Sequence, residues 1–255
     1  MESEFDSSHL SNTSSRALRV NPKYRRILLK LSGETFGGSK GFGFDYDTIS
    51  RIAENIISVI ELKVEVGVVV GGGNIFRGAE SSDGNIARVA GDHMGMLSTV
   101  INSICLQQML EQKEVPTRVM SAIEMREVCE PYIKRRADRH LEKERVVIFA
   151  AGTGNPFFTT DTAAVLRATE VGAEVVIKAT KTDGVYDRDP IIDPDAKRFS
   201  HLSYDEVLSR DLKVMDATAI AFCRDNKIPI QVLDLNAKDS IKKAVCGETV
   251  GTLIN

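Results

Sequence analysis

The sequence predicts a single three-layer α/β/α domain with a mostly parallel central sheet. Apolar runs of strand length alternate with segments whose apolar residues recur at helical spacing. Several of these runs are apolar on both faces, as are the central strands of parallel sheets. No repeat, low-complexity linker or break in composition follows residue 19. We therefore expect one domain over residues 20–255, preceded by a disordered leader at residues 1–19.

The expected elements follow one another at short intervals. An apolar strand at residues 26–31 contains Lys30 near its end. A helix then follows Asp47, which we expect to be its N-terminal cap, because isoleucines and an alanine recur on one helical face after it. The remaining expected elements are strands at residues 66–70, 118–122, 146–149, 174–180, 228–233 and 251–254, and helices at residues 91–109, 162–167, 203–209, 215–226 and 238–245.

The composition argues against several classes of protein. Hydrophobic residues make up 42% and charged residues 27%, which is the balance of a water-soluble chain with a core. A net charge of −3 gives no bulk reason to bind nucleic acid, and no apolar run approaches the roughly 20 residues that span a bilayer. The 4 cysteines stand singly, which favours neither a zinc site nor a disulfide framework. We expect a cytoplasmic protein, with the plastid stroma as the alternative, and neither a membrane nor a nucleic acid as partner.

Two glycine turns after predicted strands are typical of phosphate-binding loops. Lys30 stands beside the turn Ser32-Gly33, and ligands of α/β folds bind outside the carboxyl ends of the strands. The strand at residues 66–70 runs into Gly71-Gly72-Gly73, where the backbone can approach a ligand closely, and Arg77 can contact phosphate oxygens. The second of these loops has neither the Walker A nor the dinucleotide pattern. The alternative is a solvated lysine at a strand end and a packing turn with a surface arginine.

A third turn joins the strand at residues 146–149 to the helix at residues 162–167. It contains two glycines, Asn155 and several hydroxyl groups, and it ends at Asp161. Backbone N–H groups at such a helix start can bind an anion, so a ligand site is one interpretation. The other interpretation is an ordinary Gly/Pro/Asn turn in which Thr159 or Thr160 caps the helix.

The helix at residues 91–109 and the basic stretch at residues 134–140 carry less information. His93 is interpreted as structural, because no nucleophile or second metal ligand stands at a useful spacing. Met94, Met96 and Leu97 are expected in the core. The basic stretch fits a solvated helix face as well as a partner site.

Five segments, in this order, resemble the bacterial-type uridylate kinases of the amino acid kinase superfamily. The lysine and glycine element is shared across the superfamily, whereas GDHMGML and GTGNPFFTTD are similar to the uridylate kinase branch in particular. The resemblance covers roughly residues 24–254 and implies the amino acid kinase fold. The segments are Lys30-Leu31-Ser32-Gly33-Glu34 and residues 71–78, 91–97, 153–161 and 178–189.

This resemblance implies transfer of the γ-phosphoryl group of ATP to UMP, giving ADP and UDP, in pyrimidine nucleotide biosynthesis. Mg²⁺ would be the cofactor, carried by the nucleotide without a direct ligand from the protein. The residues that would bind ATP are Lys30, Leu31, Ser32, Gly33, Gly73, Arg77, Thr180, Tyr186 and Asp189. The residues that would bind UMP are Gly72, Asp92, Thr153, Gly154, Asn155, Pro156, Phe157, Phe158, Thr159 and Thr160, with the two phenylalanines as walls for the uracil.

The resemblance also implies regulation and assembly. Members of this family are hexamers inhibited by UTP, so GTP and UTP are expected as effectors and a hexamer as the homo-oligomeric state. In place of the usual K/N-V-D, Lys181-Thr182-Asp183 departs from the family pattern at a position that we expect to be exposed. The loop that matches the segment used in activation by GTP consists of Gly38, Ser39, Lys40, Gly41, Phe42 and Gly43.

The chemistry of the residues agrees with the implied reaction. The phosphate of UMP, with a second pKa of about 6, is already an anionic nucleophile, so no general base is needed. Two anionic nucleotides do need cations where they meet, and we expect Lys30 and Arg77 to act there as catalytic residues together with Mg²⁺. Asp161 is the third expected catalytic residue and would orient the lysine or hold the water shell of the metal. Lys178 and Lys213 are further candidate cations.

Two alternatives remain. Another kinase of the superfamily would phosphorylate a carboxylate, a carbamate or isopentenyl phosphate, and it should lack the run at residues 153–160. A nucleotide-binding storage or regulatory protein on the same fold would have lost the transfer reaction. The presence together of Lys30, Arg77, Asp92 and Asp161 argues against this second alternative.

Overall fold

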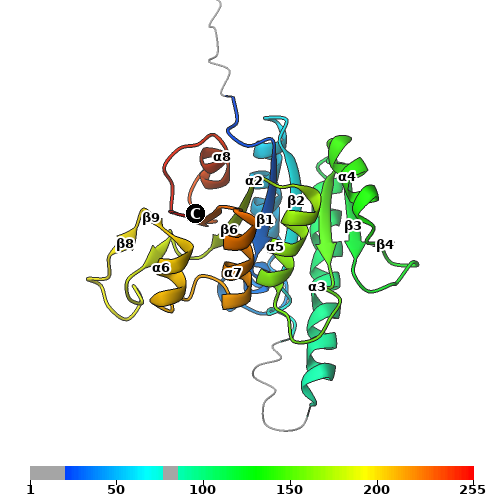
Figure 1. The fold of residues 1–255 in the computed structure, drawn as a ribbon. Coiled ribbons are helices and arrows are strands. Elements are labelled where there is room, and N and C mark those ends of the chain that lie inside the picture. Colours follow the sequence, from blue (N-terminus) through cyan, green and yellow to red (C-terminus); the bar gives the residue numbers. More distant parts are fainter. Residues whose placement is uncertain (1–20, 77–85) are drawn as a thin grey trace, which may run out of the picture.

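The computed structural model describes residues 21–76 and 86–255 (Figure 1). The predicted leader at residues 1–19 lies outside the described residues. Within the described part of the chain, one sheet of nine strands runs through the molecule, in the order β4-β3-β5-β2-β1-β6-β10-β11-β9. Its strands are β1 (Arg26–Leu31), β2 (Glu65–Val70), β3 (Thr117–Ser121), β4 (Glu130–Pro131), β5 (Val146–Ala150), β6 (Val175–Thr180), β9 (His201–Leu202), β10 (Ile230–Asp234) and β11 (Thr252–Ile254).

The sheet is parallel except where β11 pairs antiparallel with β10. A separate antiparallel ribbon is formed by β7 (Val185–Tyr186) and β8 (Arg198–Phe199). The parallel pairing brings the carboxyl ends of β1, β2, β5 and β6 to the same edge of the sheet. Each predicted glycine turn or hydroxyl-rich turn that follows one of these strands therefore lies at that edge.

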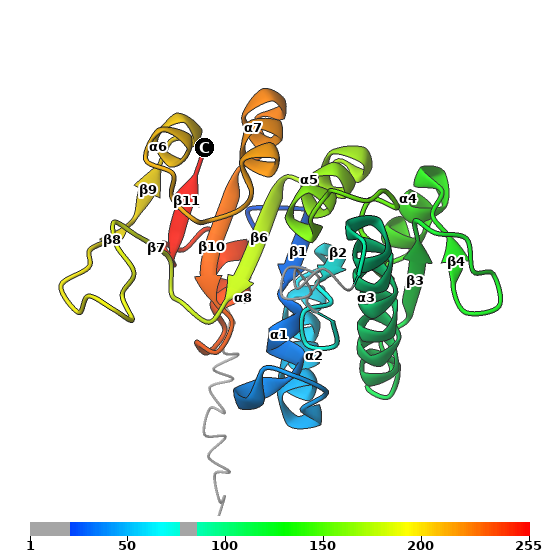
Figure 2. The same cartoon turned by 90° about the horizontal axis from the view of Figure 1, so that it is seen from below.

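Helices cover both faces of the sheet, as Figure 2 shows for α5 and α7 on one side and α2 on the other. The alternation of β1 explains the two layers, since Ile27 and Leu29 belong to one buried cluster and Leu28 to the other. The helices are α1 (Gly33–Phe36), α2 (Tyr46–Ile60), α3 (Arg88–Glu111), α4 (Lys134–Glu142), α5 (Thr160–Val171), α6 (Tyr204–Ser209), α7 (Ala217–Asn226) and α8 (Ser240–Val245), with a 3₁₀ turn at Gly38–Lys40.

This architecture confirms the predicted three-layer α/β/α fold. The predicted strands and helices are all present, with ends that differ by a few residues. The predicted cap of α2 was wrong, because Asp45 and not Asp47 has the extended backbone of a cap and accepts a hydrogen bond from the Thr48 N–H at 2.8 Å. Asp47 lies in the first turn of the helix.

The prediction that Met94, Met96 and Leu97 are all core residues was wrong for two of them. Met96 is buried, but Met94 is 41% exposed and Leu97 is 50% exposed. Their exposed neighbours along α3 include Ile101 and Ile104, at spacings that place the four side chains on one helical face. We call Met94, Leu97, Ile101 and Ile104 the α3 stripe. Among the described helices, none is both long enough and apolar enough to cross a membrane.

Candidate active site

Two lysines and one aspartate form a buried cluster at the carboxyl edge of the sheet. Lys30 of β1 and Lys178 of β6 are register partners on adjacent parallel strands, so their side chains leave the same face of the sheet. Asp161, in the first turn of α5, receives both of them, with Nζ of Lys30 at 2.7 Å from Oδ1 and Nζ of Lys178 at 2.9 Å from Oδ2. We call these three residues the Lys-Asp-Lys cluster.

The cluster holds two positive charges against one negative charge in a largely water-free setting. Burial opposes ionisation of Asp161, but the two lysines outweigh it and hold the pKa of this carboxyl below its ordinary value. Burial, with the repulsion of Lys30, lowers the pKa of Lys178, and the attraction of Asp161 only partly offsets this. The start of α5 also favours a carboxylate, because the N-terminal end of a helix carries partial positive charge. The cluster is therefore a preorganised cationic site with one excess positive charge when both lysines are protonated.

The Tyr186 hollow, a cavity of about 650 Å³, opens next to this cluster. Both lysines of the cluster line it, and so do the loop after β6 and the segment at residues 210–214. Tyr186 donates a hydrogen bond to Asp183 at 2.6 Å. Of the residues predicted to bind ATP, those that line this hollow are Lys30, Ser32, Thr180, Tyr186 and Asp189.

The other predicted ATP residues lie elsewhere. Leu31 is fully buried, and Gly33 is buried at the start of α1. Gly73 lines a different hollow. Arg77, which was also predicted as catalytic, lies outside the described residues. Lys213 lines the Tyr186 hollow, but its side chain is exposed and pairs with Asp211 at 2.6 Å, so it differs from the buried Lys178.

The Asp92 hollow, a smaller cavity of about 160 Å³, lies between α3, the turn after β2 and the turn before α5. Glycines and threonines make up much of its wall. Of the residues predicted to bind UMP, Gly72, Asp92, Thr153, Phe158, Thr159 and Thr160 line it. The residues of this hollow that sequence reasoning did not assign are Phe76, Gly91, Gly95, Met96, Thr99 and Gly152.

The remaining predicted UMP residues, Gly154, Asn155, Pro156 and Phe157, do not line this hollow. Phe157 is 66% exposed, and the guanidinium group of Arg88 lies 5.5 Å from its ring centre. Its backbone has a φ of 72°, which places its N–H on Oδ2 of Asp92 at 2.8 Å. Phe157 therefore contributes its backbone to the site, whereas Phe158 contributes a side chain.

Asp92 anchors the turn before α5 to α3. It accepts the Phe157 N–H and both of its oxygens accept from Nε of Arg88, at 3.0 and 2.9 Å. Burial opposes its ionisation, but these hydrogen bonds and the charge of Arg88 hold the pKa of Asp92 below its ordinary value. A second tie comes from Thr99 of α3, whose Oγ1 accepts the Ala151 N–H at 2.8 Å.

Asp216 is a further residue that sequence reasoning missed. It caps α7 by accepting the Ala219 N–H at 2.8 Å, and it also accepts from the hydroxyl groups of Thr159 and Thr162. Thr159 is in turn the N-terminal cap of α5. Two residues before Asp216, the carbonyl of Val214 accepts a hydrogen bond from Lys178. Asp216 thus fixes the hydroxyl groups at the start of α5, where Thr159 lines the Asp92 hollow.

Ser32 lines the Tyr186 hollow and Gly72 lines the Asp92 hollow, and the segments after β1 and β2 that contain them touch backbone to backbone. A Cβ atom on Gly33 would lie 2.5 Å from the Gly73 nitrogen and 2.8 Å from the Gly71 oxygen. A Cβ atom on Gly72 would lie 2.8 Å from the Gly95 oxygen of α3. These positions require glycine, so the sequence pattern reflects a close approach of loops as well as access for a ligand.

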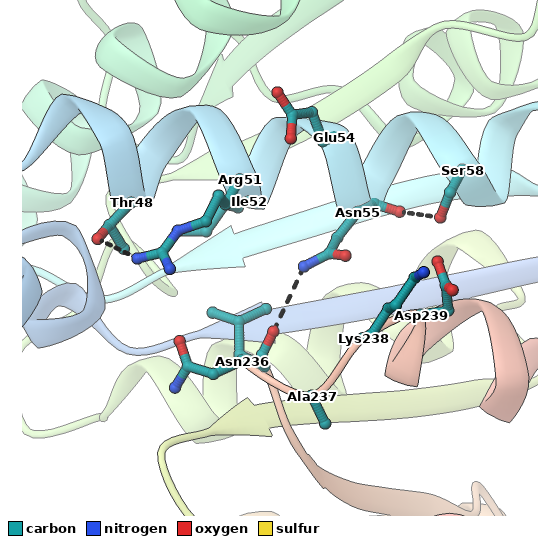
Figure 3. Close-up of a pocket in the computed structure, with 11 residues that line it drawn as sticks. Thr48, Arg51, Ile52, Glu54, Asn55, Ser58, Asn236, Ala237, Lys238 and Asp239 are labelled. Atoms are coloured by element: carbon teal, nitrogen blue, oxygen red, sulfur yellow. Dashed lines mark hydrogen bonds between the residues drawn. The ribbon is translucent and has the colours of Figure 1, made fainter.

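Another hollow, of about 280 Å³, lies between α2 and residues 235–239 and shares no lining residue with the other two (Figure 3). Its wall includes Arg51 and Asn55, and Nδ2 of Asn55 donates to the Leu235 carbonyl at 3.3 Å. It contains none of the residues predicted for ATP or UMP.

The donor atoms of the site are compatible with a magnesium ion that arrives with a nucleotide. In residues 21–76 and 86–255 there is no group of three His, Cys, Asp or Glu side chains that could hold a metal. Both oxygens of Asp161 are engaged in ion pairs, one with Lys30 and one with Lys178. The protein side of the site therefore offers cations and N–H groups, which suit phosphate oxygens.

The model of the amino acid kinase family matches residues 25–234. The chain belongs to the amino acid kinase family. Among solved structures it is similar to the UMP kinase of Bacillus anthracis, with 39% identity and a TM-score of 0.88 over 91% of this chain and 96% of that one. It is also similar to the UMP kinase of Ureaplasma parvum, with 35% identity and a TM-score of 0.85 over 91% and 98% of the two chains. The uridylate kinase of Archaeoglobus fulgidus matches at 29% identity and a TM-score of 0.70, over 90% and 99%.

Proposed function

We propose that this member of the amino acid kinase family is a UMP kinase, which transfers the γ-phosphoryl group of ATP to UMP. The observation that carries the proposal is the position of the Lys-Asp-Lys cluster between two hollows. Its lysines line the Tyr186 hollow, and Asp161 directly follows Thr160 of the Asp92 hollow. Similarity to UMP kinases over nearly the whole chain supports the same activity.

In this proposal ATP occupies the Tyr186 hollow and UMP the Asp92 hollow. Phosphoryl transfer needs aligned reactants and neutralised charge more than covalent help. Lys30 and Lys178 stabilise negative charge on the transferring group, because they are already fixed and largely dry before the substrates arrive. Asp161 keeps the two ammonium groups together and in place. The acceptor phosphate needs no general base, since it is ionised near neutral pH with a second pKa of about 6.

Mg²⁺ bound to ATP would neutralise part of the phosphate charge. The predicted contributions of Arg77 and of residues 154–157 to ligand binding stay predictions, as do those of Leu31, Gly33 and Gly73 to ATP. The predicted location in the cytoplasm or plastid stroma also stays a prediction.

A coupled assay of ADP release tests the function. We expect turnover with UMP as acceptor and much lower turnover with CMP, AMP or carbamate. Turnover with carbamate and not with UMP would indicate another kinase of the superfamily. ATP binding without turnover of any acceptor would favour a storage or regulatory protein on the same fold.

Regulation by GTP and UTP is part of the proposal. The GTP effect rests on the resemblance of the 38–43 loop to the activating segment of related kinases, and the UTP effect on the resemblance of the whole chain to that family. Phe42 of this loop is 70% exposed, so the loop presents an aromatic side chain to solvent. We expect GTP to raise the rate or lower the UMP requirement, and UTP to inhibit. Rates that do not change across GTP and UTP concentrations would contradict both effects.

We also propose that the chain forms a homo-oligomer through the α3 stripe. The predicted oligomer is a hexamer. Four large apolar side chains on one helical face are costly to leave in water. Sedimentation velocity should find an oligomer for the wild type and a smaller species for Leu97→Glu. An unchanged sedimentation coefficient would place the contact elsewhere.

A further inference from the structure

Two buried asparagines link the loops of the site to α3. Asn74 follows the glycines of the turn after β2, and Asn102 lies on the inner side of α3; they are 3% and 0% exposed. Nδ2 of Asn74 donates to Oδ1 of Asn102 at 3.1 Å, and Nδ2 of Asn102 donates to Oδ1 of Asn74 at 2.7 Å. We call this exchange the amide pair. Neither residue was singled out from the sequence.

Each amide uses its second N–H on a different loop. Asn102 donates to the Gly71 carbonyl at 2.7 Å, and Asn74 donates to the Gly43 carbonyl at 2.8 Å. The Gly43 N–H returns a hydrogen bond to the Asn74 carbonyl at 2.8 Å. Because carbonyl oxygens only accept, the side-chain atom beside the Gly43 carbonyl and the one beside the Gly71 carbonyl must both be amide nitrogens, which fixes the orientation of each side chain. A continuous chain of hydrogen bonds thus connects Gly43 to Gly71.

The position of Gly71 matters to both hollows. Its N–H donates to the Leu31 carbonyl at 2.9 Å, and its oxygen lies against Gly33 in the turn after β1. The next two residues, Gly72 and Gly73, line the Asp92 hollow. A shift of the Gly71 carbonyl would therefore displace the contact between the turns after β1 and β2.

We propose that the amide pair positions the 71–73 loop for phosphoryl transfer and couples it to the 38–43 loop. Asn74 and Asn102 are positioning residues in this proposal, since they act through backbone groups. The inference rests on the proposed function and adds to it a route by which the 38–43 loop and the acceptor site influence each other. Binding at either loop would tighten the other through the same two side chains.

A paired substitution separates positioning from stability. Asn102→Leu alone removes the donor to the Gly71 carbonyl and the partner of Oδ1 and of one N–H of the buried Asn74 amide, which is costly, while Asn74 still donates to the Gly43 carbonyl. The double variant Asn74→Leu/Asn102→Leu replaces both amides with apolar groups of similar size, so no buried amide is left half-paired and only the Gly43 and Gly71 carbonyls lose an amide donor. We expect the double variant to unfold at a higher temperature than Asn102→Leu, yet with kcat/KM for UMP lowered about 10-fold to 100-fold by the misplaced loop.

Asn55→Leu is the matched control, since Asn55 donates to a carbonyl in the hollow of Figure 3, which shares no lining residue with the Tyr186 hollow or the Asp92 hollow. Its kinetic constants should equal those of the wild type. If the double variant folds and its kcat/KM for UMP stays within about twofold of the wild type, the amide pair serves stability alone and the proposal is overturned.

Hydrogen exchange on the wild type tests the coupling without any variant. Saturation with UMP should slow exchange in a peptide that contains Gly43, although that residue is not in the Asp92 hollow. Unchanged exchange there, with UMP turnover present, would overturn the coupling. Absence of UMP turnover in the wild type would instead remove the proposed function itself.

Discussion

The Tyr186 hollow and the Asp92 hollow differ in what forms their walls. The larger hollow, of about 650 Å³, is lined largely by long or charged side chains from loops after β6 and α6. The smaller one, of about 160 Å³, is lined mainly by glycines, threonines and backbone atoms. Side chains outside this hollow, such as Asp216, hold its threonine side chains in place. From this difference we expect ligand binding in the smaller hollow to depend on residues that never touch the ligand. Ligand binding in the larger hollow should depend mainly on residues that do touch it.

The largest effect is expected at the cluster that serves both hollows. Asp161→Asn removes the charge that holds Lys30 and Lys178 together and leaves two buried ammonium groups facing a neutral amide. We expect kcat to fall about 10²-fold to 10³-fold, the scale of losing one preorganised electrostatic contact. Thermal stability should fall as well, because breaking a buried ion pair from one side typically costs about 3–5 kcal/mol.

Steady-state kinetics and calorimetric titration of both nucleotides would check this. Loss of binding for only one nucleotide, with kcat preserved, would mean that the cluster belongs to one hollow alone.

The next effect concerns the alkaline side of the pH profile. Burial lowers the pKa of Lys178 from its ordinary value of 10.5, so this lysine should lose its proton, and the enzyme its rate, at a lower pH than an exposed lysine would. The folding stability depends on pH in the opposite direction to the activity. Between the lowered pKa and 10.5 the unfolded state binds more protons, so the contribution of Lys178 to stability rises with pH while activity falls.

Lys178→Arg separates the two outcomes, because a guanidinium group stays charged to a pH above about 12. The alkaline fall in kcat should move to higher pH in this variant, even if its kcat at neutral pH is lower. If the alkaline fall in kcat stays at the same pH in this variant, a group other than Lys178 causes it.

A moderate effect is expected for Asp216→Asn, which tests the smaller hollow at a distance. The amide oxygen can still cap α7, but the side chain can no longer accept from every hydroxyl that the carboxylate serves. We expect kcat/KM for UMP to fall about 5-fold to 10-fold, as for one lost hydrogen bond, with KM for ATP nearly unchanged.

Asp45→Asn is its matched control, since Asp45 is also an aspartate that caps a helix, and it touches neither hollow. If kcat/KM falls equally for ATP and UMP in Asp216→Asn, the proposed distinction between the walls of the two hollows is wrong.

The smallest effect is expected in the larger hollow. Tyr186→Phe removes a hydroxyl group that donates to Asp183 and leaves the ring in place. We expect KM for ATP to rise by less than about threefold, since one exposed hydrogen bond contributes little net free energy. A loss as large as that of Asp216→Asn would show that the wall of the larger hollow is also held at a distance.

Much of the fold follows from local patterns in the sequence. The apolar run before Lys30 and the run before Gly71 predict buried strands, and a parallel sheet places their turns at one edge. What the sequence cannot provide is the order of the strands. Lys178 and Lys213 were equal candidates until the pairing of β1 with β6 brought Lys178 beside Lys30.

The misses have similar physical causes. Asp216 contacts threonines 54 and 57 residues earlier in the chain, so no local pattern marks it. Met94 and Leu97 are apolar residues on the outer side of α3, and hydrophobicity alone does not say whether the sheet or another molecule covers a helix face. Asp45 and Asp47 differ in backbone conformation and not in residue type. Residues 154–157 were predicted from the resemblance as ligand contacts, and their part in binding stays a prediction.

β1 lies in the middle of the sheet, with β2 on one side and β6 on the other. Edge strands such as β4 and β9 can open without disturbing the lysine that β1 carries, whereas β1 itself is released only when the whole sheet comes apart. Catalysis should then persist through partial denaturation and end abruptly. In a urea titration, phosphoryl transfer would stay constant through any early, partial loss of far-UV circular dichroism and would fall with the main transition, which makes the reaction a reporter of the intact sheet.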